Sequence, residues 1–218
     1  HDTAFLAACV GPSGRVFGFD IQAQAIVAAR QRLGAETAVT LHQIGNKREH
    51  NYYWYLTEIF YSKNPRPALN GEPYYSGYKD ARGAAVGVNY TRGADGGTDK
   101  DNEIVHSGMY GSFLSGGLAG HVYGAEGIWG GDIEPSAPTH MWDAFKWKSG
   151  ADMQYLRTFA FSIGNRYQEL EPMADLVSPN KTHDVLSYEG WAYCARTPDQ
   201  NIFLVFFEKG CIQSDIRG

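Results

Sequence analysis

Cysteine is scarce in this chain, and the few residues present form no metal or redox motif. Among 218 residues there are only three cysteines, Cys9, Cys194 and Cys211, with no C-x-x-C spacing. An odd count with wide separations excludes a disulfide framework of the kind that stabilises small secreted domains. Cys194 and Cys211 flank a predicted pair of strands, and we expect two buried thiols there rather than a disulfide. No metal site is predicted.

Long apolar runs, clusters of basic residues and internal repeats are also lacking. No apolar stretch reaches the length that crosses a bilayer, so we expect no membrane partner. The net charge is −5 and Lys and Arg are not clustered, which argues against a nucleic-acid partner. The chain begins at His1 with neither Met nor a signal-like segment, which indicates a processed chain or a fragment.

Aromatic residues and glycine are plentiful. Aromatics make up 14% of the chain, with 14 Tyr and 5 Trp, and there are 26 glycines. Rings contact the apolar faces of sugars and glycines shape loops, so this mixture suits a carbohydrate-handling protein. It equally suits an aromatic-rich core. The length and the 43% hydrophobic content allow one large domain or two small ones.

The first 44 residues alternate between strand and helix patterns. Residues 15–20 form a buried strand ending in Asp20, residues 22–33 an amphipathic helix with Gly34 at its C-cap, and residues 38–41 the start of another strand. That order predicts an α/β layer with parallel strands.

After Gly45 the sequence becomes aromatic and glycine-rich. The patterns predict helices and strands in alternation, followed by a β-hairpin whose turn is at 197–200. The expected helices are 50–62, 103–116 and 152–164, and the expected strands are 67–70, 118–123, 191–194 and 202–207.

The segment 67–75 is the strongest candidate for a functional site. A short apolar strand there runs through Asn70 into Glu72, a carboxylate at a Gly-Pro turn, and Tyr74 and Tyr75 follow immediately. A rigidly placed acid ringed by aromatic faces, at the end of a strand, is what sugar-cleaving barrels require. Without further context, a carboxylate in such a turn is most often simply solvated.

The second predicted strand supplies further candidates for contacts with substrate. His121 lies within it, and Tyr123 and Trp129 follow, so these residues could bind a sugar hydroxyl or stack on a ring. Core packing is the alternative for all three. The loop beyond holds possible substitute carboxylates, for which solvated loop charges are the alternative: Asp132, Glu134 and Asp143.

From about Gly45 onward the chain resembles the apiosidase-like glycoside hydrolases, which are (β/α)₈ barrels followed by a small β-domain named as collagen-binding. The resemblance implies that Glu72 ends the seventh barrel strand and is the nucleophile, and that 118–123 is the eighth strand. The residues that carry it, in order, are 48–50, 67–75, 109–117, 119–124, 128–130, 159–164 and 190–193.

The first 44 residues resemble a different family, the small class I methyltransferases described as rRNA methylases. The matching runs are 1–7 and 16–22. The resemblance implies that Asp20 bonds the ribose hydroxyls of S-adenosylmethionine. The first strand and the glycine loop of that family are absent from this sequence.

The two resemblances together predict a chimeric or truncated chain, joined near residues 42–46. We expect a methyltransferase-like α/β fragment (1–44), the C-terminal part of a hydrolase barrel (45–175) and the start of a β-sandwich-like domain (176–218). A retaining glycosidase needs two carboxylates roughly 5 Å apart. The resemblance places the acid/base on an earlier strand that this chain lacks, so we expect an inactive fragment.

The expected substrate is a side chain of a poly- or oligosaccharide, and no cofactor is predicted. The parent hydrolase is expected to be a periplasmic or secreted bacterial protein. Two alternatives stay open: methyl transfer through residues 1–44, and a non-catalytic carbohydrate-binding or structural module that uses Tyr74, Tyr75, Tyr123 and Trp129.

Overall fold

The computed structural model describes residues 52–63, 68–77, 96–183, 189–211 and 215–216, all within the second of two compact units, Ile44–Gly218. The elements predicted for residues 1–44 and the expected junction at 42–46 lie outside the described residues. Within the described residues, no helix is both long and apolar enough to cross a membrane.

In chain order the elements are α3 (Tyr52–Phe60), β1 (Leu69–Asn70), α5 (Asp99–Leu114), β2 (Gly120–His121), α6 (Met141–Ala144), α7 (Lys148–Ser162), η1 (Gly164–Glu169), β3 (Glu171–Pro172), η2 (Ala174–Leu176), β4 (Val177–Ser178), β5 (Ala192–Arg196), β6 (Phe203–Phe207) and β7 (Asp215–Ile216).

Two short parallel strands lie at the centre of the α/β part. β1 pairs with β2 in parallel, with Leu69 opposite Gly120 and Asn70 opposite His121. α5 lies between them in sequence and packs against both, which makes a β–α–β unit. Parallel neighbours require such a crossover connection. The mixed α/β class expected from the sequence is therefore confirmed.

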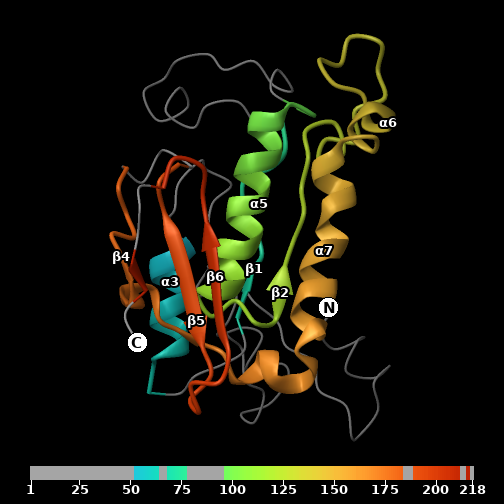
Figure 1. Cartoon of the computed structure of the whole chain (residues 1–218). Coiled ribbons are helices and arrows are strands. Elements are labelled where there is room, and N and C mark those ends of the chain that lie inside the picture. Colours follow the sequence, from blue (N-terminus) through green and yellow to red (C-terminus); the bar gives the residue numbers. More distant parts are fainter. Residues whose placement is uncertain (1–51, 64–67, 78–95, 184–188, 212–214, 217–218) are drawn as a thin grey trace, which may run out of the picture. The chain divides into compact units, whose positions relative to one another are not determined.

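Three helices pack beside one another along this strand pair. α5 contacts α3 on one side and α7 on the other, and Figure 1 shows α5 and α7 running side by side. Their contact surfaces bury Leu56 of α3, Met109 and Phe113 of α5, and Leu156 of α7. The helices predicted over 50–62, 103–116 and 152–164 are confirmed, although α5 and α7 begin earlier, at Asp99 and Lys148.

Local chemistry sets both ends of α5. Thr98 is the N-cap, and its Oγ1 accepts a hydrogen bond of 3.2 Å from the backbone N–H of Asp101. Asp99 and Asp101 place negative charge in the first turn, where the helix dipole favours it. The chain leaves the helix through Gly116 at φ +103°, and a Cβ there would lie 3.0 Å from Cβ of Phe60. Glycine therefore lets α5 end closely packed against α3.

The C-terminal part contains the predicted β-hairpin. β5 and β6 are antiparallel, with Cys194 opposite Val205, and β3 pairs with the other edge of β5. The turn between the hairpin strands contains Gln200 at φ 60°. β4 and β7 form a separate antiparallel pair. The hairpin and its turn at 197–200 are thus confirmed.

One hydrophobic core joins the helices to this sheet. Trp191 and Tyr193 are almost completely buried in the same cluster as Met109 and Phe113 of α5. The buried Glu208 carboxylate strengthens the junction, because it accepts hydrogen bonds from the Ser107 hydroxyl and from the backbone N–H of Trp191, the latter at 3.1 Å. Trp191 is therefore a core residue shared by the helices and the sheet.

Two of the cysteines fall within the described residues, and both are free thiols. Cys194 is buried and Cys211 is half-buried. The Cys211 thiol donates to the carbonyl oxygen of Trp191 at 3.1 Å. The expectation of thiols rather than a disulfide is confirmed for this pair, and full burial is confirmed for Cys194.

Candidate active site at the ends of the parallel strands

The segments that follow β1 and β2 continue side by side beyond the regular strands. The backbone N–H of Ser76 donates to the carbonyl of Gly124, and the N–H of Glu126 donates to the carbonyl of Ser76, both at 2.9 Å. A parallel bridge pairs Ser76 with Ala125. The carboxyl ends of parallel strands are where α/β folds build their sites. The candidate site is therefore the surface built by residues 71–77 and 122–126.

Glu72 lies in the first of these segments, two residues beyond the end of β1, and is half-buried. The ring of Tyr75 packs on the backbone of Gly124, where a Cβ would lie 2.4 Å from the ring carbon Cδ1. Burial and, second, the negative charge of Glu72 raise the pKa of Tyr75. The Glu72 carboxylate is thus within electrostatic range of a ring that joins the two segments.

A buried carboxylate organises the residues after Glu72. Asp101, in the first turn of α5, is completely buried. Its Oδ1 accepts hydrogen bonds from the Tyr74 hydroxyl at 2.9 Å and from the backbone N–H of Gly77 at 2.8 Å, and its Oδ2 accepts from the Ser76 hydroxyl. Each donor comes from the strand extension, so Asp101 ties that segment to α5.

The same network reaches the second strand and α7. The hydroxyls of Ser76 and Ser149 lie 2.8 Å apart, and the hydroxyl of Tyr123 lies 3.1 Å from that of Ser149. Burial is the main cause of the raised pKa of Tyr123, which the hydrogen bond with Ser149 partly offsets. The Tyr123 side chain is therefore half-buried, and its hydroxyl is engaged in a hydrogen bond with Ser149.

Trp147, the N-cap residue of α7, packs beside this network. Its indole lies in a slot between three glycines, so that a Cβ on Gly96, Gly77 or Gly97 would come within 2.1, 2.7 or 2.8 Å of a ring atom. Gly77 and Gly97 also have positive φ angles, +81° and +74°. Glycine is required at these positions both by backbone conformation and by the approach of the ring.

Two residues predicted to bind substrate, Asn70 and His121, face the helices. They are opposite one another in the parallel pair. The Nδ2 amide of Asn70 donates to the Ser112 hydroxyl in α5 at 2.9 Å. The imidazole Cε1 of His121 lies 3.8 Å from the position of a Cβ on Gly108, also in α5. Burial lowers the pKa of His121 to about 3.

The remaining predicted residues have different surroundings. Tyr74 is buried and bonded to Asp101, whereas Trp129 has 67% of its surface exposed. Of the substitute carboxylates, Asp143 pairs with Lys146 at 3.1 Å, Glu134 is exposed and Asp132 is half-buried. Asp20 lies outside the described residues, so its predicted role with S-adenosylmethionine stays a prediction.

Sequence reasoning missed several residues that the fold brings to this surface. Glu126 is only 2% exposed and follows the second strand extension directly. The sequence carries a signal for it, since Glu126 stands beside a glycine just after a predicted strand, as Glu72 does. Asp101, Ser149 and Trp147 carry no such local signal. Within the described ranges, no group of three or more His, Cys, Asp or Glu residues is arranged to hold a metal.

Comparisons with known proteins agree with this architecture. A model of the apiosidase-like catalytic domain matches residues 16–165, a span that includes α3, α5, α7 and the strand pair between them. A solved structure described as a glycoside hydrolase aligns with 88% of this chain at a TM-score of 0.59 and 15% identity. The aligned region is 52% of that structure's chain, so this chain spans about half its length. No curated protein matches.

The structural likeness, at that identity, is evidence for the fold alone. The family match is evidence for the family itself, because it covers more than half of the chain. It includes Glu72 and the strand-end network, which is the set of hydrogen bonds that joins Tyr74, Ser76, Gly77, Asp101, Tyr123 and Ser149. On that match, the chain belongs to the apiosidase-like family of glycoside hydrolases.

Proposed function

We propose that this chain is the C-terminal part of a retaining glycoside hydrolase that removes sugar side chains from polysaccharides. β1 and β2 would be the last two strands of its barrel. The observation that carries the proposal is the position of Glu72 beyond the carboxyl end of β1, beside a parallel neighbour. Catalytic residues of barrel enzymes come from those strand ends.

In the proposed reaction Glu72 attacks the anomeric carbon and forms a covalent glycosyl-enzyme. The bond to the leaving oxygen breaks as a second carboxyl group transfers its proton to that oxygen. The resulting carboxylate then takes a proton from water, which attacks the anomeric carbon and releases the sugar from Glu72. We place the second carboxyl group on an earlier strand of the parent barrel, beyond this chain, so the chain alone would not cleave natural glycosides.

The buried network supports a nucleophile at this position. A nucleophile must be held within about 0.5 Å of its productive geometry, which requires support from residues behind it. Asp101 binds the segment just after Glu72 through Tyr74, Ser76 and Gly77. Tyr75 packs on Gly124 of the neighbouring segment. The backbone just after Glu72 is therefore held both by α5 and by the neighbouring segment.

The experiment separates glycosylation from acid catalysis. Aryl 2-deoxy-2-fluoroglycosides with a dinitrophenolate leaving group need no proton donor for departure, so an isolated nucleophile can be trapped as a stable ester. We would incubate the chain with a panel of such glycosides, including an apiofuranoside, and measure the mass of the intact protein and its peptides. The expected result is one added glycosyl group on the peptide that contains Glu72.

Matched variants identify the labelled residue. Glu72→Gln should abolish labelling, whereas Glu134→Gln, which alters an exposed acid of the loop after β2, should leave it unchanged. Retention of the label in Glu72→Gln, or its loss only in Glu126→Gln, would remove Glu72 from the mechanism. A folded chain that no glycoside of the panel labels would also contradict the proposal.

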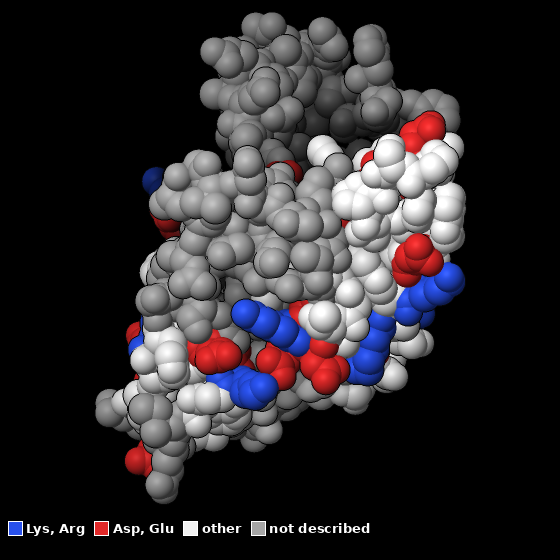
Figure 2. All heavy atoms as spheres, turned by 90° about the horizontal axis from the view of Figure 1, so that it is seen from above, with Lys and Arg blue, Asp and Glu red and all other residues white. Residues whose placement is uncertain are grey.

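A specific observation favours a second candidate, a non-catalytic carbohydrate-binding module. The segment between β2 and α7, which includes α6, exposes 67% of Trp129, 65% of Phe145 and 46% of Trp142, and His140 stacks on Trp142 with ring centroids 4.7 Å apart. Figure 2, which views the molecule from above, shows acidic and basic side chains intermixed over the described residues. Such a mixed surface would suit a neutral ligand. Binding of pectic oligosaccharides without covalent labelling, weakened by Trp129→Ala but not by Tyr155→Ala, would support this module.

The methyltransferase hypothesis concerns residues 1–44, which the structure does not describe, and no described observation favours it. Calorimetry with S-adenosylmethionine tests it directly. Micromolar binding that Asp20→Ala abolishes would revive that function.

A further inference from the structure

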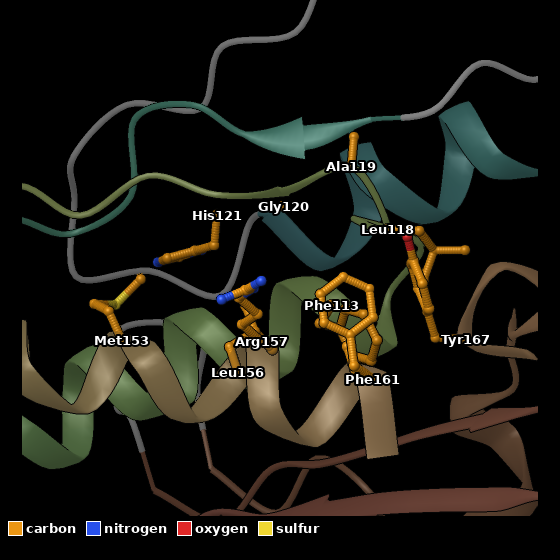
Figure 3. A pocket seen from close by; sticks show the side chains of 11 residues that line it. Phe113, Leu118, Ala119, Gly120, His121, Met153, Leu156, Arg157, Phe161 and Tyr167 are labelled. Carbon is orange, nitrogen blue, oxygen red and sulfur yellow. The ribbon is translucent and has the colours of Figure 1, made fainter. Parts of the chain in front are cut away.

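A cavity of about 410 Å³ opens between β2 and α7, on the side of the strand pair that faces the helices (Figure 3). Residues 118–121 form one wall, and Met153 and Leu156 of α7 form the opposite one. Phe113 and Tyr167 contribute aromatic surface. This volume lies within the range of roughly 300–1,000 Å³ that small-molecule sites occupy.

One polar atom inside this cavity lacks a partner. Nδ1 of His121 is buried and makes no hydrogen bond within the described part of the chain. Figure 3 shows the imidazole extending from β2 into the cavity, toward Met153. Because burial lowers its pKa to about 3, the ring is neutral near pH 7 and carries one N–H donor and one acceptor. Buried polar atoms in native proteins are normally hydrogen-bonded, so this nitrogen is a candidate to bind a ligand.

A cation lies on the same wall as Met153. Arg157 of α7 lines the cavity, and Figure 3 shows its guanidinium turned toward the space beside His121. It lies 5.5 Å from the ring centroid of Phe161. Among the ion pairs of the described residues, none includes Arg157. By contrast, Arg166 in η1 pairs with Asp199 at 2.6 Å. Arg157 is therefore available for an anion.

We propose that this cavity binds a small organic carboxylate with an apolar body. Its carboxylate would pair with the Arg157 guanidinium, whose planar fork matches that group. Its body would pack against Leu156 and Phe113, and a polar substituent would reach Nδ1 of His121. A free sugar fits less well, because most of its hydroxyls would face apolar walls without partners. The site is separate from Glu72, which belongs to the candidate active site, so this proposal does not rest on the hydrolase function.

The probe is 3-phenylpropanoate, and the matched control ligand is the neutral 3-phenylpropanamide. Calorimetry on the whole chain is expected to show a Kd for the carboxylate of about 1 mM or below. The amide should bind about five- to tenfold more weakly, since it loses the charged pair at a partly solvated site. Circular dichroism on the same sample verifies that the chain is folded.

Three variants test the assignment. Arg157→Gln should make the two ligands bind equally, and Ala160→Phe should abolish binding by filling the cavity. Arg196→Gln is the matched control, because Arg196 also stacks on a ring, 5.6 Å from the centroid of Phe203, but does not line the cavity. It should leave both affinities unchanged.

Several results would overturn the proposal. These are no carboxylate binding by the folded chain at 10-fold above the expected Kd, equal affinity for acid and amide, or an Arg196→Gln effect as large as that of Arg157→Gln. Concentration-dependent dimerisation that Phe161→Asp abolishes, without ligand binding, would assign the cavity to a second copy of the chain and overturn it as well.

Discussion

Replacement of Asp101 by alanine tests the central claim about the strand-end network. The carboxylate is completely buried and accepts three hydrogen bonds, from the Tyr74 hydroxyl, the Ser76 hydroxyl and the Gly77 N–H. Alanine accepts none. Because Tyr74, Ser76 and Gly77 are themselves buried, water does not replace the lost acceptor unless the segment opens.

The expected loss follows from those three donors. A buried donor left unpaired costs about 1–3 kcal/mol, and Ser76 keeps an alternative partner in Ser149, 2.8 Å away. The hydrogen bonds that Tyr74 and Gly77 donate to Asp101 are then lost, and at about 2 kcal/mol each this gives a loss of about 4 kcal/mol in the free energy of unfolding. In a chain of this length that loss lowers Tm by roughly 8–16 °C.

Urea unfolding followed by tryptophan fluorescence measures the change, and Asp99→Ala is the control. Asp99 occupies the same first turn of α5 but is exposed, so its replacement removes the interaction with the helix dipole and a weak attraction to Lys148, both small at an exposed site. A large Asp101 effect beside a small Asp99 effect supports the network. Equal losses in the two variants would refute the reasoning, since the helix dipole would then explain both.

Three further perturbations follow from other described contacts. Lys181→Met should lower the free energy of unfolding by about 1 kcal/mol, because the lysine ammonium lies 4.2 Å from the ring centroid of Tyr53; thermal unfolding measures this. Cys194 should react with a disulfide reagent at pH 8 roughly 100-fold more slowly than in the unfolded chain, because burial raises its pKa to about 11; peptide mass spectrometry measures the labelling. Burial acts to raise the pKa of Asp152, but the hydrogen bond from Lys148 and the neighbouring positive charge outweigh it and lower that pKa. The stabilisation is therefore present above the unfolded pKa near 3.9 and lost as the pH falls below it, so Asp152→Asn should flatten the stability profile between about pH 5 and 3.

The controls for these three use residues of the same type in exposed or less buried positions. Lys209→Met removes a surface pair with Glu103 and should cost less than Lys181→Met. Cys211, which is half-buried, should be labelled before Cys194. Asp143→Asn alters an exposed acid and should leave the acid limb of the stability profile in place. The reasoning fails for Lys181 if Lys209→Met costs as much stability, and for Cys194 if Cys211 is labelled no faster. It fails for Asp152 if Asp143→Asn flattens the acid limb to the same extent.

The helices and the hairpin could be predicted because their signals are local. The helical spacing of apolar residues over 152–164 identified α7, and the turn at 197–200 identified the pair β5–β6. The predicted start of α5, at residue 103, is too late because residues 99–102 are all polar and add no apolar spacing. Gly108 and Gly111 weaken the helical signal further along the helix, yet both are buried in α5.

The candidate site was only partly predictable, because its support comes from distant segments. Glu72, Tyr74 and Tyr75 are contiguous and end a strand, so they could be proposed together. Asp101 and Ser149 meet that segment only through tertiary structure. Side chains alternate between the two faces of a strand, but the sequence does not tell which face meets the helices. For that reason Asn70 and His121 could be placed on a strand without knowing that they face α5.

The position of α5 explains why so many buried polar contacts converge on one helix. Its first turn supplies Asp101 to the segment after β1, and its third turn supplies Ser107 to Glu208 beside the C-terminal sheet. Its apolar face meanwhile packs with Trp191 and Tyr193 in a single cluster. A shift of α5 would therefore break contacts at the strand ends and at the sheet simultaneously. Because buried carboxylates are strongly destabilising when their donors are withdrawn, the two anchors restrict that shift more than apolar packing alone would. Through α5, which contacts both β1 and β5, the C-terminal sheet thus contributes to the rigidity of the segment that holds Glu72.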